Sequence, residues 1–265
     1  FTLPNESGGF VNNNGTTYVA WNWKAGTSFT NDASSTGIGS IDSAGSFNND
    51  SGFSIVSYTG TGTAGTIKHG LNSVPRMIIV KRRDGSDSWL VQHGSLGAGK
   101  ALNLDSTGAV QTYDPYWNNT EPTSSVFSVG NDGRTNGSSE TYIAYCFSGV
   151  QGFSKMGSYT GNANANGPFV YTGFKPAFVM FKNTTGNNWG IIDNKRDSYN
   201  GALHRLLPNT SGADNTGAGV VIDFLSNGFK CRNADGLENG AAEIIYMAFA
   251  ENPFVASNFN AATAR

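Results

Sequence analysis

Two stretches of the chain decide the fold: "SYTGTGTAGTIKHGLNSVPRMIIVK" at residues 57–81 and "SYTGNANANGPFVYTGFKPAFVMFK" at residues 158–182. They are equally long, open with the same four residues and end on the same residue, with little else in common. Besides the first four residues and the closing lysine, the two stretches share a proline at the same position. A spacing kept while most letters change indicates a duplicated structural unit, so internal repeats are considered before any local motif.

The similarity extends well beyond these two stretches. Residues 52–150 align with residues 152–252 at an offset of 100 to 102, so hardly any insertion separates the two copies. Trp89 meets Trp189 in this alignment, and "TYIAYCFSG" meets "EIIYMAFAE". We therefore predict two tandem repeats, and we expect the two aligned tryptophans to fill cores.

The sequence of each repeat consists of short runs that are typical of β-strands. Runs such as "GFSIVSYTG", "RMIIVKRR" and "SWLVQHG" are rich in β-branched and aromatic residues and are bounded by Gly, Asn, Asp or Pro. No window has a convincing helical period; residues 194–207 come nearest. The pattern predicts an all-β fold: two tandem β-sandwich, jelly-roll-like domains from an internal duplication, preceded by a β-hairpin.

The remaining segments are assigned from the same alignment. Residues 1–25 match the end of a repeat and are predicted to be the terminal hairpin of a preceding unit. Residues 26–51 have no partner and are interpreted as a connector with one short strand around 39–47. Residues 253–265 are predicted to be a C-terminal tail.

The shared residues have expected backbone roles. Pro75 and Pro176 precede apolar runs, and proline is tolerated at the first residue of a strand. Gly60 and Gly161 close the "SYTG" motif, where we expect turns with positive φ.

The two cysteines, Cys146 and Cys231, lie in apolar runs without any spacing typical of a metal site. We predict two small buried side chains rather than a disulfide, and no metal or cofactor.

Composition argues against several classes of protein. Charged residues make up 14% of the chain, against about 25% in an average soluble domain. The net charge of -2 offers no field for a polyanion, so nucleic acid is not expected as a partner. The one basic cluster, residues 81–83, is followed by Asp84 and Asp87 and is interpreted as a solvated hairpin tip. No apolar run is long enough for a membrane span, and no signal peptide opens the chain.

Catalytic patterns are weak. The three histidines, His69, His93 and His204, have no partner histidine in the other repeat, and no nucleophile elbow is present. The carboxylates show no spacing that separates a glycosidase pair from surface residues. The sequence therefore predicts a protein that is not an enzyme.

One loop differs sharply between the repeats. "QTYDPYWNNTEPTSS", from residue 111, is aromatic and polar, whereas its counterpart from residue 211 has no aromatic residue. Aromatic faces beside amides and carboxylates are typical of saccharide sites. The candidate ligand-binding residues are Tyr113, Asp114, Tyr116, Trp117, Asn118 and Asn119. The alternative is that these aromatic residues cover the end of a sandwich or contact a neighbouring subunit.

Several segments together, including "TYVAWNWKAG", "GFSIVSYTGTG", "PFVYTGFKPAFVMFK", "FLSNGFK" and "YMAFAENPF", resemble a family of marine-phage tail-fibre and other virion structural proteins. The resemblance covers residues 17–254. It implies a β-structured virion protein on the particle surface. Its partners would be other copies of itself, commonly as a homotrimer, other virion proteins and a host-surface glycan or receptor. It transfers no site residue.

The function expected on this basis is that of a fibre-like adhesin. The alternatives are a purely structural capsid decoration or tail component without a ligand and, more distantly, a polysaccharide depolymerase.

Overall fold

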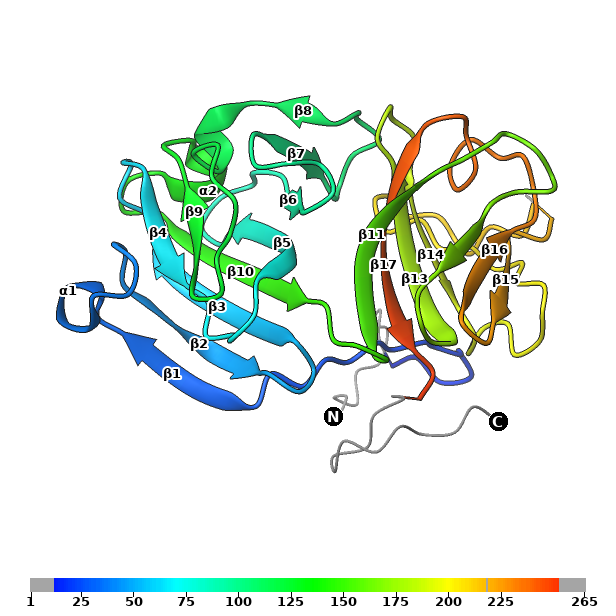
Figure 1. The fold of residues 1–265 in the computed structure, drawn as a ribbon, viewed down its shortest axis with the longest axis horizontal. Helices are drawn as coiled ribbons and strands as arrows, with labels where there is room; N and C mark the ends of the chain where they lie inside the picture. The colour runs from blue at the N-terminus through cyan, green and yellow to red at the C-terminus, as the bar shows by residue number, and fades with distance from the viewer. Residues whose placement is uncertain (1–11, 218, 253–265) are drawn as a thin grey trace.

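The computed structural model describes residues 12–217 and 219–252 and confirms the all-β prediction. Figure 1 shows two units side by side. The strands of the first are β1 (Thr27–Asn31), β2 (Ser43–Asn48), β3 (Phe53–Thr59), β4 (Gly65–Lys68), β5 (Pro75–Arg82), β6 (Leu90–His93), β7 (Lys100–Asn103), β8 (Gln111–Thr112), β9 (Val126–Val129) and β10 (Thr141–Ser148). Those of the second are β11 (Ser154–Thr160), β12 (Phe169–Tyr171), β13 (Pro176–Asn183), β14 (Trp189–Asp193), β15 (Ile222–Leu225), β16 (Gly228–Cys231) and β17 (Glu243–Ala250). The helices are α1 (Ala33–Thr36), the 3-10 turn η1 (Asp114–Tyr116) and α2 (Gly133–Asn136).

Each unit has one large sheet and one smaller one. In the first, an eight-stranded sheet of order β1-β2-β3-β10-β5-β6-β7-β8 faces the pair β4-β9. In the second, a four-stranded sheet of order β11-β17-β13-β14 faces a three-stranded sheet of order β12-β16-β15. All the named strand pairs are antiparallel.

The duplication is visible in the strand order. The central strands β3-β10-β5-β6 of the first unit recur as β11-β17-β13-β14 in the second. Pro75 begins β5 and Pro176 begins β13, as the sequence predicts. The register also shifts next to each proline, beside Ser148 in one copy and Ala250 in the other. The repeat therefore preserves a bulge as well as an order of strands.

The shared lysine has a defined role. The Lys81 ammonium donates to the carbonyl oxygen of Gly85 at 2.8 Å, and that of Lys182 donates to Gly186 at 2.9 Å. In both copies the lysine thus satisfies a turn carbonyl four residues further on. Lys182 is buried, which lowers its pKa to about 8.

The prediction of positive φ at Gly60 and Gly161 is wrong, since neither lies in that region. A Cβ atom at Gly60 would stand 2.2 Å from the carbonyl oxygen of Gly137, and one at Gly161 would stand 2.0 Å from that of Gly240. Glycine is required at both positions because two backbone segments approach closely, not because of the turn.

Three apolar cores follow from alternation along the central strands. On β5, Ile78 and Val80 point into the core of the first unit, whereas Met77 and Ile79 point into a core between the units. Strands β10, β13 and β17 alternate in the same way. The large sheets of the two units therefore pack face to face, and each is covered on both sides. The aligned tryptophans both belong to this middle core: Trp189 is buried and Trp89 partly so.

Among the described residues, hydrogen bonds join the units at the middle core. The Trp189 indole donates to the carbonyl oxygen of Asn103 at 2.8 Å. The Nε2 atom of His93 lies 3.2 Å from the carbonyl oxygen of Tyr246, and the main chain of Val110 donates to Thr184 at 2.8 Å. These bonds fix the register of one unit against the other.

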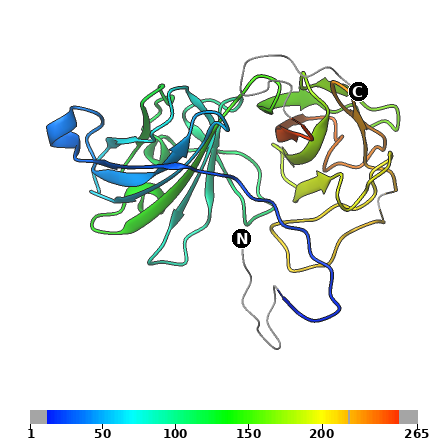
Figure 2. The ribbon, with the colours of Figure 1, turned by 90° about the horizontal axis from the view of Figure 1, so that it is seen from below.

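The N-terminal segment differs from its predicted form. Of the expected hairpin, residues 1–11 lie outside the described residues, and residues 12–25 form no strand. Instead this segment runs from the second unit toward the first, as Figure 2 shows from below, with Trp21 and Trp23 packed against the middle core. The segment 26–51, expected to be a connector, supplies β1 and β2 to the large sheet. The expected tail, 253–265, lies outside the described residues.

Candidate functional site

The aromatic loop lies at one end of the first unit, over α2. The hydroxyl of Thr135 donates to the carbonyl oxygen of Tyr116 at 3.0 Å, and the main-chain N–H of Gly130 donates to the same oxygen at 3.1 Å. The main-chain N–H of Asp132 donates to Pro115. These bonds hold η1 in place.

Two of the six predicted site residues are buried. Trp117 is 0% exposed and Tyr116 is 3% exposed, and both belong to the core of the first unit. Their assignment as ligand-binding residues is therefore wrong. The physical reason lies in the smaller sheets: in the second unit a third strand, β15, contributes Ile222 and Phe224 to the core, whereas the first unit has only β4 and β9 there and fills its core from this loop.

The other four predicted residues are exposed. Tyr113 is 45% exposed, and its ring meets that of Tyr116 edge on at 4.8 Å. Asp114, Asn118 and Asn119 line a surface hollow of about 490 Å³. The remaining lining comes from residues 62–64, Pro115, Gly130 and Asn131.

The polar side chains around this hollow are free to meet a ligand. The side chains of Asp114, Asn118 and Asn119 form no hydrogen bond with another residue in the described part of the chain. Asn118 and Asn119 have φ values of 52° and 43°, a left-handed conformation that asparagine tolerates better than most residues. The loop thus holds two amides and one carboxylate around a single hollow.

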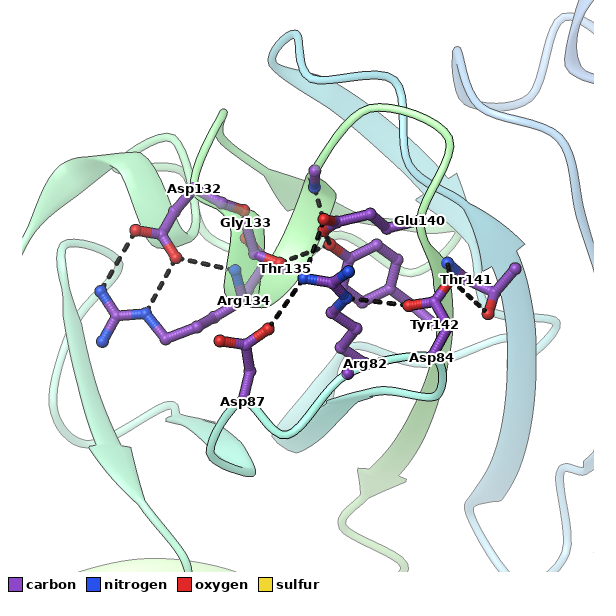
Figure 3. Close-up of polar contacts among 12 residues, drawn as sticks. Arg82, Asp84, Asp87, Asp132, Gly133, Arg134, Thr135, Glu140, Thr141 and Tyr142 are labelled. Carbon is purple, nitrogen blue, oxygen red and sulfur yellow. Dashed lines mark hydrogen bonds and ion pairs between the residues drawn. The ribbon is translucent and has the colours of Figure 1, made fainter.

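An ion-pair network beside α2 uses the charges of the predicted basic cluster (Figure 3). Arg82 contacts Asp84 at 2.8 Å, Asp87 at 3.2 Å and Glu140 at 2.8 Å. The hydrogen bond from Arg82 and the main-chain donor of Thr141 hold the pKa of the Asp84 carboxyl to about 2. Arg82 is consequently neutralised within the protein.

Arg134 supports the loop from the other side of the same region (Figure 3). Its guanidinium binds Asp132 in Figure 3. The same guanidinium lies over the ring of Tyr116 at 4.3 Å. The hydroxyl of Tyr142 bonds to Gly133 and Glu140, and its pKa is raised by burial. Arg134 thus supports the ring of Tyr116, and Tyr142 holds the start of α2. Both side chains are engaged in contacts within the protein.

An asparagine bridge closes the same end of each unit. The amide of Asn136 donates to the carbonyl oxygens of Thr63 at 2.7 Å and Gly130 at 2.6 Å, and it accepts from the N–H of Thr61 at 2.8 Å. In the second unit the buried Asn239 makes the corresponding three bonds, to Asn164, Asn233 and Asn162. Each asparagine precedes a glycine, in "TNG" and "ENG". This shared Asn-Gly pair could have been found by aligning the two repeats, and it marks both bridging asparagines.

In the described part of the chain, His69, His93 and the two cysteines offer no further site. His69 and His93 are buried with both ring nitrogens in contact with main-chain groups, and burial lowers the pKa of each to about 4. Cys146 and Cys231 are buried in separate cores, as predicted, and burial raises the pKa of each to about 12. Within residues 12–217 and 219–252 no group of three His, Cys, Asp or Glu residues is placed to hold a metal.

The second unit buries one ion pair. Arg205 contacts Glu238 at 2.7 Å, and both side chains are almost inaccessible. Burial raises the pKa of the Glu238 carboxyl to about 7, and the Arg205 guanidinium opposes that rise. Among the described helices, none is long and apolar enough to cross a membrane.

A family model described as "Domain of unknown function (DUF7483)" matches residues 1–253. The chain belongs to this family. The match spans both repeats and the segment before them, so the two units form part of one family architecture. No curated protein and no solved structure matches the chain.

Proposed function

We propose that this chain is a fibre-like virion structural protein of a tailed phage that contributes to host attachment by binding saccharide at the loop end of its first unit. The observation that carries the proposal is the hollow of about 490 Å³ bordered by Asp114, Asn118 and Asn119, with the exposed ring of Tyr113 next in the chain. The sequence resemblance described above supplies the virion context.

The chemistry of this hollow favours a neutral, hydroxyl-rich ligand. Amides donate and accept hydrogen bonds, and a carboxylate accepts from hydroxyls, so together they match the alternating groups of a sugar ring. No cation lines the hollow in the described part of the chain, because Arg82 and Arg134 are paired with carboxylates outside it. A strongly anionic ligand is therefore disfavoured here.

The face-to-face packing of the units supports a role in attachment. A site held on a scaffold with three apolar cores and hydrogen bonds between its units loses little ordering entropy on binding. Weak saccharide contacts gain strength when several copies are displayed together, as on a virion. A decoration protein without a ligand needs no such array of unpaired amides.

Competition for host adsorption tests the proposal. The isolated chain, added in excess, is expected to reduce adsorption of the phage that carries it to its host cells. The variant Asp114→Ala should compete less well, whereas Asp50→Ala, at an exposed position away from the hollow, should compete like the wild type.

Two results would contradict the proposal and favour another function. Failure of the wild-type chain to compete, with antibody labelling confined to the capsid, would favour a structural decoration protein. A fall in the viscosity of host polysaccharide on incubation would favour a depolymerase.

A further inference from the structure

The second unit carries a larger hollow, of about 610 Å³, that the proposed function does not use. It lies between the N-terminal segment and the long loop that follows β14. Its lining residues are Thr17, Tyr18, Val19, Trp21, Lys195, Arg196, His204, Leu206 and Asp214. Aromatic rings thus come from one wall and charged groups from the other.

An aspartate fixes the histidine in this hollow. The carboxylate of Asp197 accepts the main-chain N–H groups of Leu203 at 2.8 Å and His204 at 2.7 Å, and its other oxygen contacts Nδ1 of His204 at 2.7 Å. Burial raises the pKa of Asp197, but these bonds outweigh it and leave the pKa below its usual value. With Nδ1 engaged, Nε2 of His204 has no hydrogen-bond partner among the described residues, and the side chain is 39% exposed.

The positively charged side chains in the hollow differ in whether they form ion pairs. Arg196 forms ion pairs with Asp193 at 2.7 Å and with Asp214 at 2.8 Å. Lys195 is exposed and forms no ion pair within the described ranges; its charge also acts on Glu251, which Lys175 holds at 2.8 Å. The ammonium of Lys195 is therefore left to face an anion, with the imidazole of His204 in the same hollow.

The aromatic wall makes the hollow more than a simple anion site. Tyr18 is 47% exposed, and its hydroxyl is fixed by the N–H of Asn13 at 3.0 Å. The Trp21 indole N–H has no partner in the described part of the chain. The exposed ring of Tyr18 therefore offers a surface on which the ring of a ligand can stack, beside Lys195 and His204.

We propose that this hollow binds a carboxylated sugar residue. The ligand carboxylate lies against the Lys195 ammonium, and the imidazole of His204, held at Nδ1 by Asp197, borders the same hollow. The sugar ring lies on Tyr18. The site is distinct from the loop end of the first unit in position and in ligand charge.

Ligand-observed NMR on the whole chain tests the proposal with three probes: glucuronate, which offers ring and carboxylate, glucose, which offers the ring alone, and acetate, which offers the carboxylate alone. Glucuronate is expected to bind more tightly than either of the others. Lys195→Ala should weaken glucuronate binding roughly tenfold, as expected for the loss of a charge-assisted contact, and Tyr18→Ala should weaken it as well.

Matched controls separate the site from general effects. Tyr199→Ala, at a residue 86% exposed in the same loop, and Lys100→Ala, in the first unit, should bind glucuronate like the wild type. The proposal is overturned if glucuronate does not bind, binds no better than glucose or acetate, or binds equally to Lys195→Ala and the wild type. Lys195 is exposed, so its variant is expected to fold.

Discussion

The Nε2 atom of His93, in the first unit, lies 3.2 Å from the main-chain carbonyl oxygen of Tyr246, in the second. Its Nδ1 atom accepts the N–H of Ser95 at 3.2 Å, so the ring must be neutral, with its proton on Nε2. This histidine joins the units only while it stays uncharged.

Acidification is therefore expected to weaken the fold. His93 and His69 have pKa values of about 4 when folded, against about 6.5 when unfolded. The unfolded chain takes up these protons first, so stability is complete above pH 6.5 and falls as the pH drops toward 4. Each histidine should cost about 2 kcal/mol of unfolding free energy between pH 7 and pH 5.

The raised pKa of Glu238 acts in the opposite direction between pH 4.5 and about 7. The informative measurement is thus a comparison of urea unfolding in the wild type and in His93→Gln at both pH values. The variant should lose less stability on acidification. Equal losses in the two proteins would contradict the assignment of His93 as a buried neutral link.

Trp117 should matter for stability. Trp117→Ala removes a side chain that is 0% exposed and should lower the unfolding free energy by about 3 to 5 kcal/mol. Tyr113→Ala, at a half-exposed ring four residues earlier, should cost less than about 1.5 kcal/mol. Denaturant midpoints measure both, and a near-neutral Trp117→Ala would place the ring outside the core.

The asparagine bridges should contribute equally in the two units. Asn136→Ala removes three hydrogen bonds to main-chain groups, as does Asn239→Ala, and each should cost about 3 kcal/mol. Asn72→Ala, at an exposed position, is the control. A loss below about 1 kcal/mol in both bridge variants would show that the bonds contribute little.

Gly60 should resist substitution by alanine. The added Cβ would stand 2.2 Å from the Gly137 carbonyl oxygen, and the required backbone shift should cost about 1 to 3 kcal/mol. At the exposed Gly108 the nearest atom is the Ser106 hydroxyl at 3.4 Å, so Gly108→Ala should leave the thermal midpoint nearly unchanged. Identical midpoints for the two variants would argue against the close approach.

The repeat made much of the fold predictable from the sequence. Two copies of one spacing indicate which letters the backbone needs, and the strand-opening prolines and buried cysteines follow from local chemistry. The sequence also contains a pattern that indicates the face-to-face packing of the units. Strands buried on one face alternate apolar and polar residues, whereas the runs within β5 and β17 are continuously apolar, as expected of sheets covered on both sides.

The site was harder to predict because exposure is not a local property. Tyr113 and Trp117 belong to one aromatic loop, yet one ring is half exposed and the other fills a core that lacks a third covering strand. Gly60 shows the same limit: its requirement comes from Gly137, which is distant in the sequence. The hollow at Lys195 and His204 depends on Tyr18, from a segment with no strand of its own.

The most direct test of attachment through the first unit is a glycan array probed with three forms of the chain. The wild type should bind a set of neutral host-surface glycans. The double variant Asp114→Ala with Asn118→Ala should lose that binding while keeping its denaturant midpoint, and Asp50→Ala should retain the binding. Equal glycan binding by the double variant and the wild type, or no binding by the wild type across glycans of its host, would contradict the account.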